Sequence, residues 1–250
     1  MTDKTQAIGL TWYISKRRRR LSRKDVELSL APNLPALQAS KKIAAVLPFN
    51  HKPLKESGNL WSDYWVIVLA LEVSPDEVWQ EIKSSVIVSG LLRAEVLRVQ
   101  PGMDMYYPHG VAKNQPVWHV VEYVVSKPER RSNYYEDQYK FSQPVIRHFW
   151  ENNAVERMIG FESERLLEDK GSLPKWDVIH ITGFKPSRLI TIAWHLLRFL
   201  PTFNGYARKV GYGSALEVVH SWRKKRTKYL VIARQDHAYT AWRSTGGRKQ

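Results

Sequence analysis

The chain has 250 residues, of which 43% are hydrophobic, and it contains no cysteine. This apolar content is enough to bury a core, and the lack of cysteine excludes disulfides, thiol nucleophiles and cysteine-ligated zinc. The 39 Lys and Arg residues outnumber the 24 Asp and Glu residues, which gives a formal charge of +15 and a pI near 9.9. Such an excess predicts a polyanionic partner, with nucleic acid favoured over an anionic membrane.

No apolar run approaches the roughly 20 residues that a membrane span needs, and the first residues lack the apolar centre of a signal peptide. The sequence therefore predicts a cytoplasmic protein. The sequence leaves a site built from His and carboxylate ligands open, but paired metal-ligand spacings such as H-E-x-x-H are absent, so no metal or cofactor is expected.

The first 60 residues are expected to form a basic extension. A short strand is predicted over residues 6–15, and seven of the next nine residues, 16–24, are basic. Residues 32–58 hold prolines and polar residues, with a helical pattern near 37–46, and an irregular or partly helical segment is expected there. Residues 61–250 are expected to form the core.

The core alternates strands and helices. The first unit is a strand at 65–73, a helix beginning at Ser74 with a Ser74/Glu77 capping box, and a strand at 94–99. An apolar helix follows Pro186 and ends at Pro201. The other expected strands are residues 117–125, 176–182, 215–222 and 229–233, with a basic turn at 223–226. This order predicts an α+β, ferredoxin-like (RRM-like) fold.

The segment between the last helix and the strand at 215–222 is rich in glycine. Gly205, Gly211 and Gly213 surround the adjacent cations Arg208 and Lys209. Glycine allows the backbone to approach a phosphate closely, and the cations would add charge. The segment lacks G-K-[ST] and follows a helix, so it is neither a Walker loop nor a dinucleotide fingerprint. The alternative is a flexible connection with glycines at its turns.

This ordering resembles the C-terminal half of the RAMP superfamily of CRISPR-associated proteins, and in particular the type IV effector subunit that caps the five-prime handle of the guide RNA. The matching pattern consists of Trp176, Ile179, Gly183, Leu196, Leu197, Arg198, Gly211, Tyr212, Gly213 and Val218. The first 60 residues and the tail after Trp222 depart from that family. The resemblance implies a ferredoxin-like fold, a crRNA ligand, contact with target DNA, backbone and large subunits as partners, no membrane partner and no catalytic residue.

Three basic segments are the expected RNA contacts. They are Gly205, Tyr206, Arg208, Lys209, Gly211, Tyr212 and Gly213 in the glycine-rich segment, Lys16, Arg17, Arg18, Arg19, Arg20, Arg23 and Lys24 in the extension, and Arg223, Lys224, Lys225 and Arg226 in the basic turn. Tyr206 and Tyr212 are candidates for base stacking, whereas surface packing is expected for Tyr134 and Tyr135. The tryptophans expected in the core are Trp65, Trp79, Trp118, Trp176 and Trp194.

Two alternatives stay open at this point. The first is a metal-independent endoribonuclease of the same superfamily, which needs a histidine base or clustered cations such as Arg17 to Arg20 and Arg243. His51, His109, His148 and His237 are the better candidates, because His119, His180, His195 and His220 lie within predicted elements and are expected to be structural. The second is a generic basic nucleic-acid-binding protein in which the glycine-rich segment has no special role.

Overall fold

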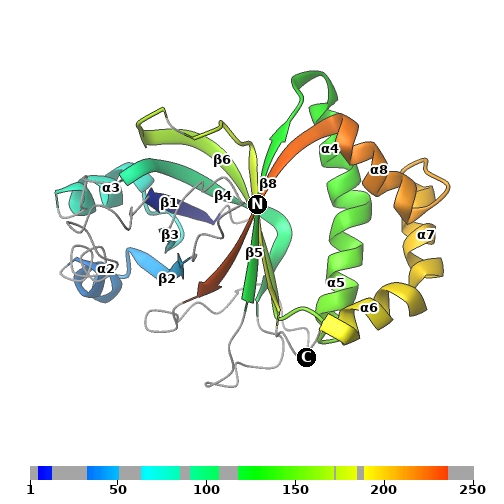
Figure 1. Cartoon of the computed structure of the whole chain (residues 1–250). Helices are drawn as coiled ribbons and strands as arrows, with labels where there is room; N and C mark the ends of the chain where they lie inside the picture. The colour runs from blue at the N-terminus through cyan, green and yellow to red at the C-terminus, as the bar shows by residue number, and fades with distance from the viewer. Residues whose placement is uncertain are drawn as a thin grey trace, which may run out of the picture. The chain divides into compact units, whose positions relative to one another are not determined.

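The structure is a computed structural model that describes residues 5–12, 33–50, 63–84, 91–106, 118–171, 173–184 and 189–235 (Figure 1). These residues form an α+β fold with eight strands and divide into two compact units. Unit 1 takes the described residues within Met1–Val99, Phe161–Pro174 and Ala233–Arg243. Unit 2 takes those within Gln100–Gly160 and Lys175–Ile232.

Unit 1 is a sheet with two helices. Its elements are β1 (Gln6–Trp12), α2 (Leu34–Ala39), β2 (Ile43–Asn50), β3 (Asp63–Leu69), α3 (Pro75–Lys83) and the adjoining parts of β4 (Leu91–Tyr106) and β6 (Arg157–Asp169). β1 pairs antiparallel with both β3 and β4, with Ile8 opposite Ile67 on one side and Val96 on the other. β3 and β4 are therefore parallel and α3 connects them, which is the split β-α-β arrangement expected from the sequence.

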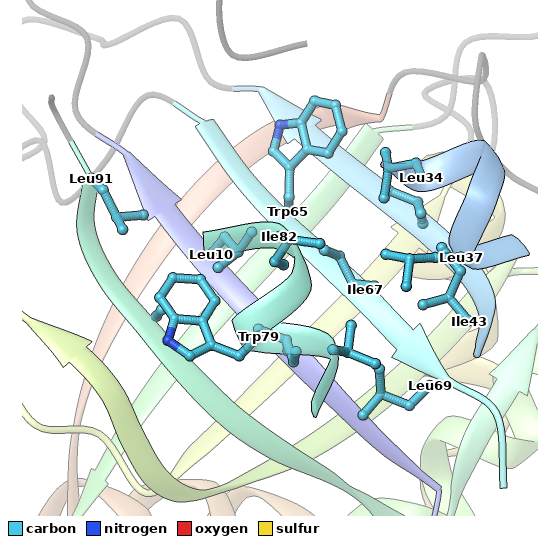
Figure 2. Close-up of a cluster of buried hydrophobic side chains, with 14 residues drawn as sticks. Leu10, Leu34, Leu37, Ile43, Trp65, Ile67, Leu69, Trp79, Ile82 and Leu91 are labelled. Atoms are coloured by element: carbon cyan, nitrogen blue, oxygen red, sulfur yellow. The ribbon is translucent and has the colours of Figure 1, made fainter. Parts of the chain in front are cut away.

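The core of unit 1 lies between this sheet and α3 (Figure 2). Trp79 and Ile82 on α3 pack with Trp65 and Ile67 on β3, and all four side chains are buried. Val78 and Ile82 are four residues apart, so they lie on one side of α3, as the sequence predicts. Pro75 occupies the first turn of α3, but Ser74 makes no side-chain cap, so the expected capping box is not formed.

A buried arginine links β4 to the chain after β6. Arg93 is 1% exposed and donates hydrogen bonds to the carbonyl oxygens of Leu173 at 2.9 Å and Pro174 at 2.8 Å. Asp169 lies 3.4 Å from the same guanidinium group and supplies the opposite charge. A buried charge is tolerated when it is paired and hydrogen-bonded in this way.

Unit 2 combines a sheet with a larger set of helices. Its elements are β5 (Trp118–Ser126), a 3-10 turn (Pro128–Arg130), α4 (Arg131–Asp137), a π-helical turn (Gln138–Ser142), α5 (Gln143–Glu151), β7 (Val178–Phe184), α6 (Leu189–Arg198), α7 (Leu200–Lys209), α8 (Ala215–Lys225), most of β8 (Arg226–Gln235) and the remaining parts of β4 and β6. β5 lies between β8 and β7, and β7 is followed by β6. β5 and β7 pair antiparallel, with Val120 opposite Thr182 and Glu122 opposite His180.

Helices of unit 2 cover one side of its sheet (Figure 1). Tyr134 of α4 packs on Val124 of β5 and Val178 of β7. Further along, Ile146 and Trp150 of α5 pack on Met103 of β4 and Met158 of β6. Tyr134 is fully buried, so the expectation that it packs on the surface was wrong.

The segment expected to be a strand at 215–222 is α8. Ser214 accepts a hydrogen bond from the Glu217 backbone N–H, and the Glu217 carboxylate accepts one from the Gly213 backbone N–H. This Ser-x-x-Glu arrangement starts a helix because it satisfies backbone donors that the first turn leaves free. The basic residues at 223–225 consequently lie in the last turn of α8, and β8 begins directly at Arg226.

Two other regions differ from expectation. Residues 43–50 form β2, paired with β3, where an irregular or helical segment was expected, because the strand is buried along nearly its whole length, with only Ala44 exposed and Asn50 partly buried. The apolar helix after residue 188 ends at Arg198, and Pro201 lies in the first turn of α7, where the missing N–H of proline costs nothing.

The predicted strands at 65–73, 94–99, 117–125 and 176–182 are confirmed as β3, β4, β5 and β7.

One tryptophan that was expected in the core is exposed. Trp65, Trp79 and Trp176 are buried, but Trp194 on α6 is 60% exposed. Within the described part of the chain, none of the helices has the length and apolar character needed to cross a bilayer.

Candidate active site

The central strands of unit 2 carry polar side chains on the side that faces the helices. Side chains alternate along β5, so Glu122 lies on the same side as Val124, which packs against Tyr134. Val120, Glu122 and their neighbour Thr182 are only partly buried although they lie on inner strands. The helices therefore leave this part of the sheet partly open to solvent.

Glu122 is the centre of a charged cluster. One carboxylate oxygen lies 3.3 Å from Nδ1 of His180, and the other lies 3.0 Å from the Arg226 guanidinium and 3.3 Å from the Lys228 ammonium group. Burial alone would raise the pKa of Glu122, but the hydrogen bond with His180 and the charges of Arg226 and Lys228 outweigh it and lower the pKa to about 2. Glu122 is therefore ionised at neutral pH.

His180 lies between two polar partners and is 3% exposed. Its Nδ1 faces Glu122, and its Nε2 lies 3.2 Å from the side-chain oxygen of Gln100. Gln100 fits there because residue 160 is glycine, since a Cβ at that position would lie 2.4 Å from the Gln100 oxygen. The amide of Gln100 accepts from a protonated Nε2, and after a half-turn of the side chain it donates to an unprotonated one.

This pair has the arrangement of a general base with an orienting carboxylate. An anionic Glu122 that accepts the Nδ1–H fixes the tautomer of His180, leaves the Nε2 lone pair to take a proton, and stabilises the imidazolium that forms. Among the described residues, no group of three or more His, Asp or Glu side chains is placed to hold a metal ion.

A second polar cluster lies where α4 meets α8. Lys225 donates to Asp137 at 2.6 Å and to the Tyr212 hydroxyl at 2.6 Å, and the Trp222 indole N–H donates to the same carboxylate at 3.2 Å. Burial lowers the pKa of Lys225, but the hydrogen bonds to Asp137 and Tyr212 outweigh it, so the pKa is raised. The next residue, Arg226, has its guanidinium over the rings of Trp222 and Tyr134.

The glycine-rich segment has a local structural role. The Gly211 N–H donates to the Arg208 carbonyl, and the Tyr212 N–H donates to the Ala207 carbonyl, with Gly211 at a φ of +83°. These are the two bonds of a Schellman motif, which ends a helix with a left-handed glycine. Gly205 lies within α7, and Gly213 precedes the cap of α8. The predicted phosphate loop is thus a corner between two helices.

Among the described residues, the predicted RNA contacts lie in different surroundings. Tyr206, Arg208 and Lys209 lie on α7, with the Lys209 ammonium 5.6 Å from the centre of the Tyr206 ring. Lys225 and Arg226 are buried against Asp137 and Glu122, whereas Arg223 and Lys224 are exposed at the end of α8. The basic run Lys16 to Lys24 lies outside the described residues.

The histidines favoured from the sequence are not those of the site. His51, His109 and His237 lie outside the described residues, and His148 packs among the rings of Phe199, Phe203 and His195. His180 was missed because a histidine within a strand was taken as structural. The available signal was that Glu122 and His180 each interrupt an apolar strand, on a side that otherwise faces a helix layer.

Known proteins resemble this chain in fold but not in sequence. No family model matches the chain, and no curated protein matches its sequence. A solved structure from Fusobacterium nucleatum, named for a proposed monooxygenase activity, matches with a TM-score of 0.53 at 7% identity over 96% of this chain and 95% of that one. An anthrone oxidase-like protein matches with a TM-score of 0.51 at 10% identity over 94% and 92%. The chain shares the fold of these proteins.

Chlorite dismutase is a third example of this likeness. The enzyme from Candidatus Nitrospira defluvii, in complex with imidazole, matches with a TM-score of 0.51 at 10% identity over 93% of this chain and 91% of that one. At such identities the likeness concerns the fold alone. These neighbours overturn the predicted membership of the RAMP superfamily, and with it the predicted crRNA, target DNA and effector-subunit partners. The residue pattern misled because two of its glycines, Gly211 and Gly213, end α7 and precede α8 and do not form a phosphate loop.

The low pKa of Glu122 makes stability depend on acidity. Its pKa falls from 4.5 to about 2 on folding, so its ionised form stabilises the protein above pH 4.5, and this contribution is lost as the pH falls towards 2. The shift corresponds to roughly 3 kcal/mol. We expect Glu122→Gln to remove this part of the acid dependence when urea unfolding is measured across that range. If the wild type and the variant lost stability equally as the pH falls, Glu122 would not have the low pKa assigned to it.

Proposed function

We propose that unit 2 is an enzyme domain that binds a small organic molecule against β5 and β7 and takes a proton from it with His180. The observation that carries the proposal is the buried His180, held by an ionised Glu122 at Nδ1 and by the side-chain amide of Gln100 at Nε2. A substrate that replaces the Gln100 contact would present its acidic proton to Nε2.

The surroundings favour an apolar substrate with one weakly acidic group. Val120 and Thr182 lie next to Glu122 and His180 on the same side of the sheet. The Thr182 hydroxyl donates to the sulfur of Met158, and Met158 packs with Met103 and Trp150. Methionine and aromatic side chains adapt to flat apolar molecules. Phenols and aromatic ketones with an activated C–H bond combine these properties.

The proposed step is a balanced proton transfer. The C–H or O–H bond of the substrate breaks, its electron pair stays on the substrate as an enolate or phenolate, and the proton moves to Nε2 of His180. Glu122 stays ionised and stabilises the imidazolium. The hydrogen bond with His180 and the charges of Arg226 and Lys228 keep the pKa of Glu122 low. An aromatic enolate is electron-rich enough to react with dioxygen as co-reactant, and the fold is shared with a protein named as anthrone oxidase-like.

Anthrone is the test substrate, because its oxidation by dioxygen gives anthraquinone and water and begins with loss of a proton from carbon. We expect the protein to accelerate dioxygen uptake and quinone formation, and His180→Gln to lower the rate at least about tenfold. Glu122→Gln should lower it as well and shift its pH dependence, because the neutral amide no longer stabilises the imidazolium.

The matched control is His220→Gln, which changes an exposed histidine on α8. This variant should keep the wild-type rate. An equal loss in the His180 and His220 variants, or a wild-type rate no faster than buffer with anthrone and with a panel of phenols, would overturn the proposal. In that case the Glu122 cluster is a structural ion network.

A further inference from the structure

Helix α6 leaves most of its surface uncovered. Ile190, Trp194 and Leu197 follow one another at spacings of four and three residues and are 84%, 60% and 72% exposed. Leu189 and Leu196 beside them are about half exposed. The helix has no buried residue, and its contacts with the protein are made through the opposite side, by Ile192 and His195.

The charged Lys and Arg side chains of α6 and α7 are not accompanied by any acidic residue in these two helices. Residues 189–209, which span α6 and α7, include no Asp or Glu but contain Arg198, Arg208 and Lys209. Arg198 lies in the last turn of α6, and all three side chains are exposed. The chain as a whole carries a formal charge of +15. An apolar face with Arg198 at its end, on a strongly basic chain, matches the chemistry of a surface that is negatively charged outside and apolar within.

The size of the face also limits its occupant. A helix of ten residues is about 15 Å long, so its outward side covers on the order of a few hundred Å². A stable interface between two protein copies buries about 800 Å² on each partner. At ten residues α6 also falls far short of the roughly 20 that a bilayer span needs, so it would lie in the surface and not cross it.

We propose that the outward face of α6 inserts into the interfacial layer of an anionic lipid membrane. Trp194 would lie at the level of the headgroups, where tryptophan is favoured, with Ile190 and Leu197 in the apolar layer beside it. Arg198, in the last turn of α6, would contact the lipid phosphates. The inference stands apart from the proposed proton transfer, because α6 carries no residue of the Glu122 and His180 pair.

Co-sedimentation of the full chain with vesicles tests this proposal. We expect binding to phosphatidylcholine vesicles that contain about one third phosphatidylserine, weaker binding to phosphatidylcholine alone, and loss of the difference at high salt. The triple variant Ile190→Ser, Trp194→Ser and Leu197→Ser should bind the anionic vesicles about tenfold less. These side chains are exposed, so the variant should unfold at the same urea concentration as the wild type.

The control is Leu216→Ser on α8, which removes a leucine that is 73% exposed from another helix of the same unit. It should keep wild-type binding. Two results would overturn the proposal. One is equal vesicle binding by the wild type and the triple variant. The other is a wild-type protein that does not bind vesicles but is a dimer by light scattering, and that the triple substitution converts to a monomer, because α6 would then be an interface between copies.

Discussion

Asp137→Ala should lower the free energy of unfolding of unit 2 by about 3–5 kcal/mol, because it leaves the Lys225 ammonium without its counter-charge inside the protein. Asp137 and Lys225 are only 5% and 11% exposed in their side chains and are 2.6 Å apart. The same carboxylate accepts from the Trp222 indole, so the substitution also leaves that donor without this acceptor. Hydrogen exchange of backbone amides in β5 and α8 measures the loss within unit 2.

The neighbouring residue supplies the control for this prediction. Glu136 pairs with Lys140 on the surface of the same helical segment, and both side chains are 55% exposed. Water screens an exposed pair of this kind, so Glu136→Gln should have little effect on stability. The paired change Asp137→Leu with Lys225→Met should recover most of the stability, because it removes both buried charges. Equal effects of the Asp137 and Glu136 substitutions would show that the buried pair is not important for stability.

Trp65→Ala should be comparably damaging to unit 1, with an expected loss of about 3–5 kcal/mol. Trp65 is 1% exposed and belongs to the cluster that β3 forms with α3 (Figure 2). Its removal would leave a cavity between the sheet and the helix that neighbouring side chains fill only in part. Urea unfolding followed by circular dichroism measures the change.

Leu71→Ala is the matched substitution outside this core. Leu71 follows β3 closely in the sequence but is 49% exposed, so its truncation should cost less than about 0.5 kcal/mol. A Trp65→Ala protein as stable as the Leu71→Ala protein would show that the contact between α3 and β3 contributes little to unit 1.

Much of the fold could be predicted from local sequence patterns. The apolar run at β3, the proline in the first turn of α3 and the strand at β4 identified the split β-α-β unit, because each signal depends on residues close in sequence. The failure at 215–222 was avoidable, since Ser214 and Glu217 are a helix-start signal three residues apart. The exposure of Trp194 could not be predicted from the neighbouring sequence, because an apolar stripe on a helix does not show whether another element covers it.

The candidate site could not be derived from the sequence for a different reason. Gln100, Glu122 and His180 are far apart along the chain, and only the register of β5 with β7 places Glu122 opposite His180. Similarly, the basic residues 223–226 are uniform in sequence, but the end of α8 directs Lys225 and Arg226 inwards to Asp137 and Glu122. Net charge predicted a polyanionic partner without showing which cations are already paired within the fold.

The most direct test of the proposed chemistry isolates the proton transfer from the later reaction with dioxygen. Anthrone is incubated with the protein in deuterated buffer without oxygen, and the loss of its exchangeable C–H signal is followed by proton NMR. The wild type and His220→Gln should accelerate this exchange over buffer, and His180→Gln should not. Equal acceleration by the wild type and His180→Gln would contradict the assignment of His180 as the base.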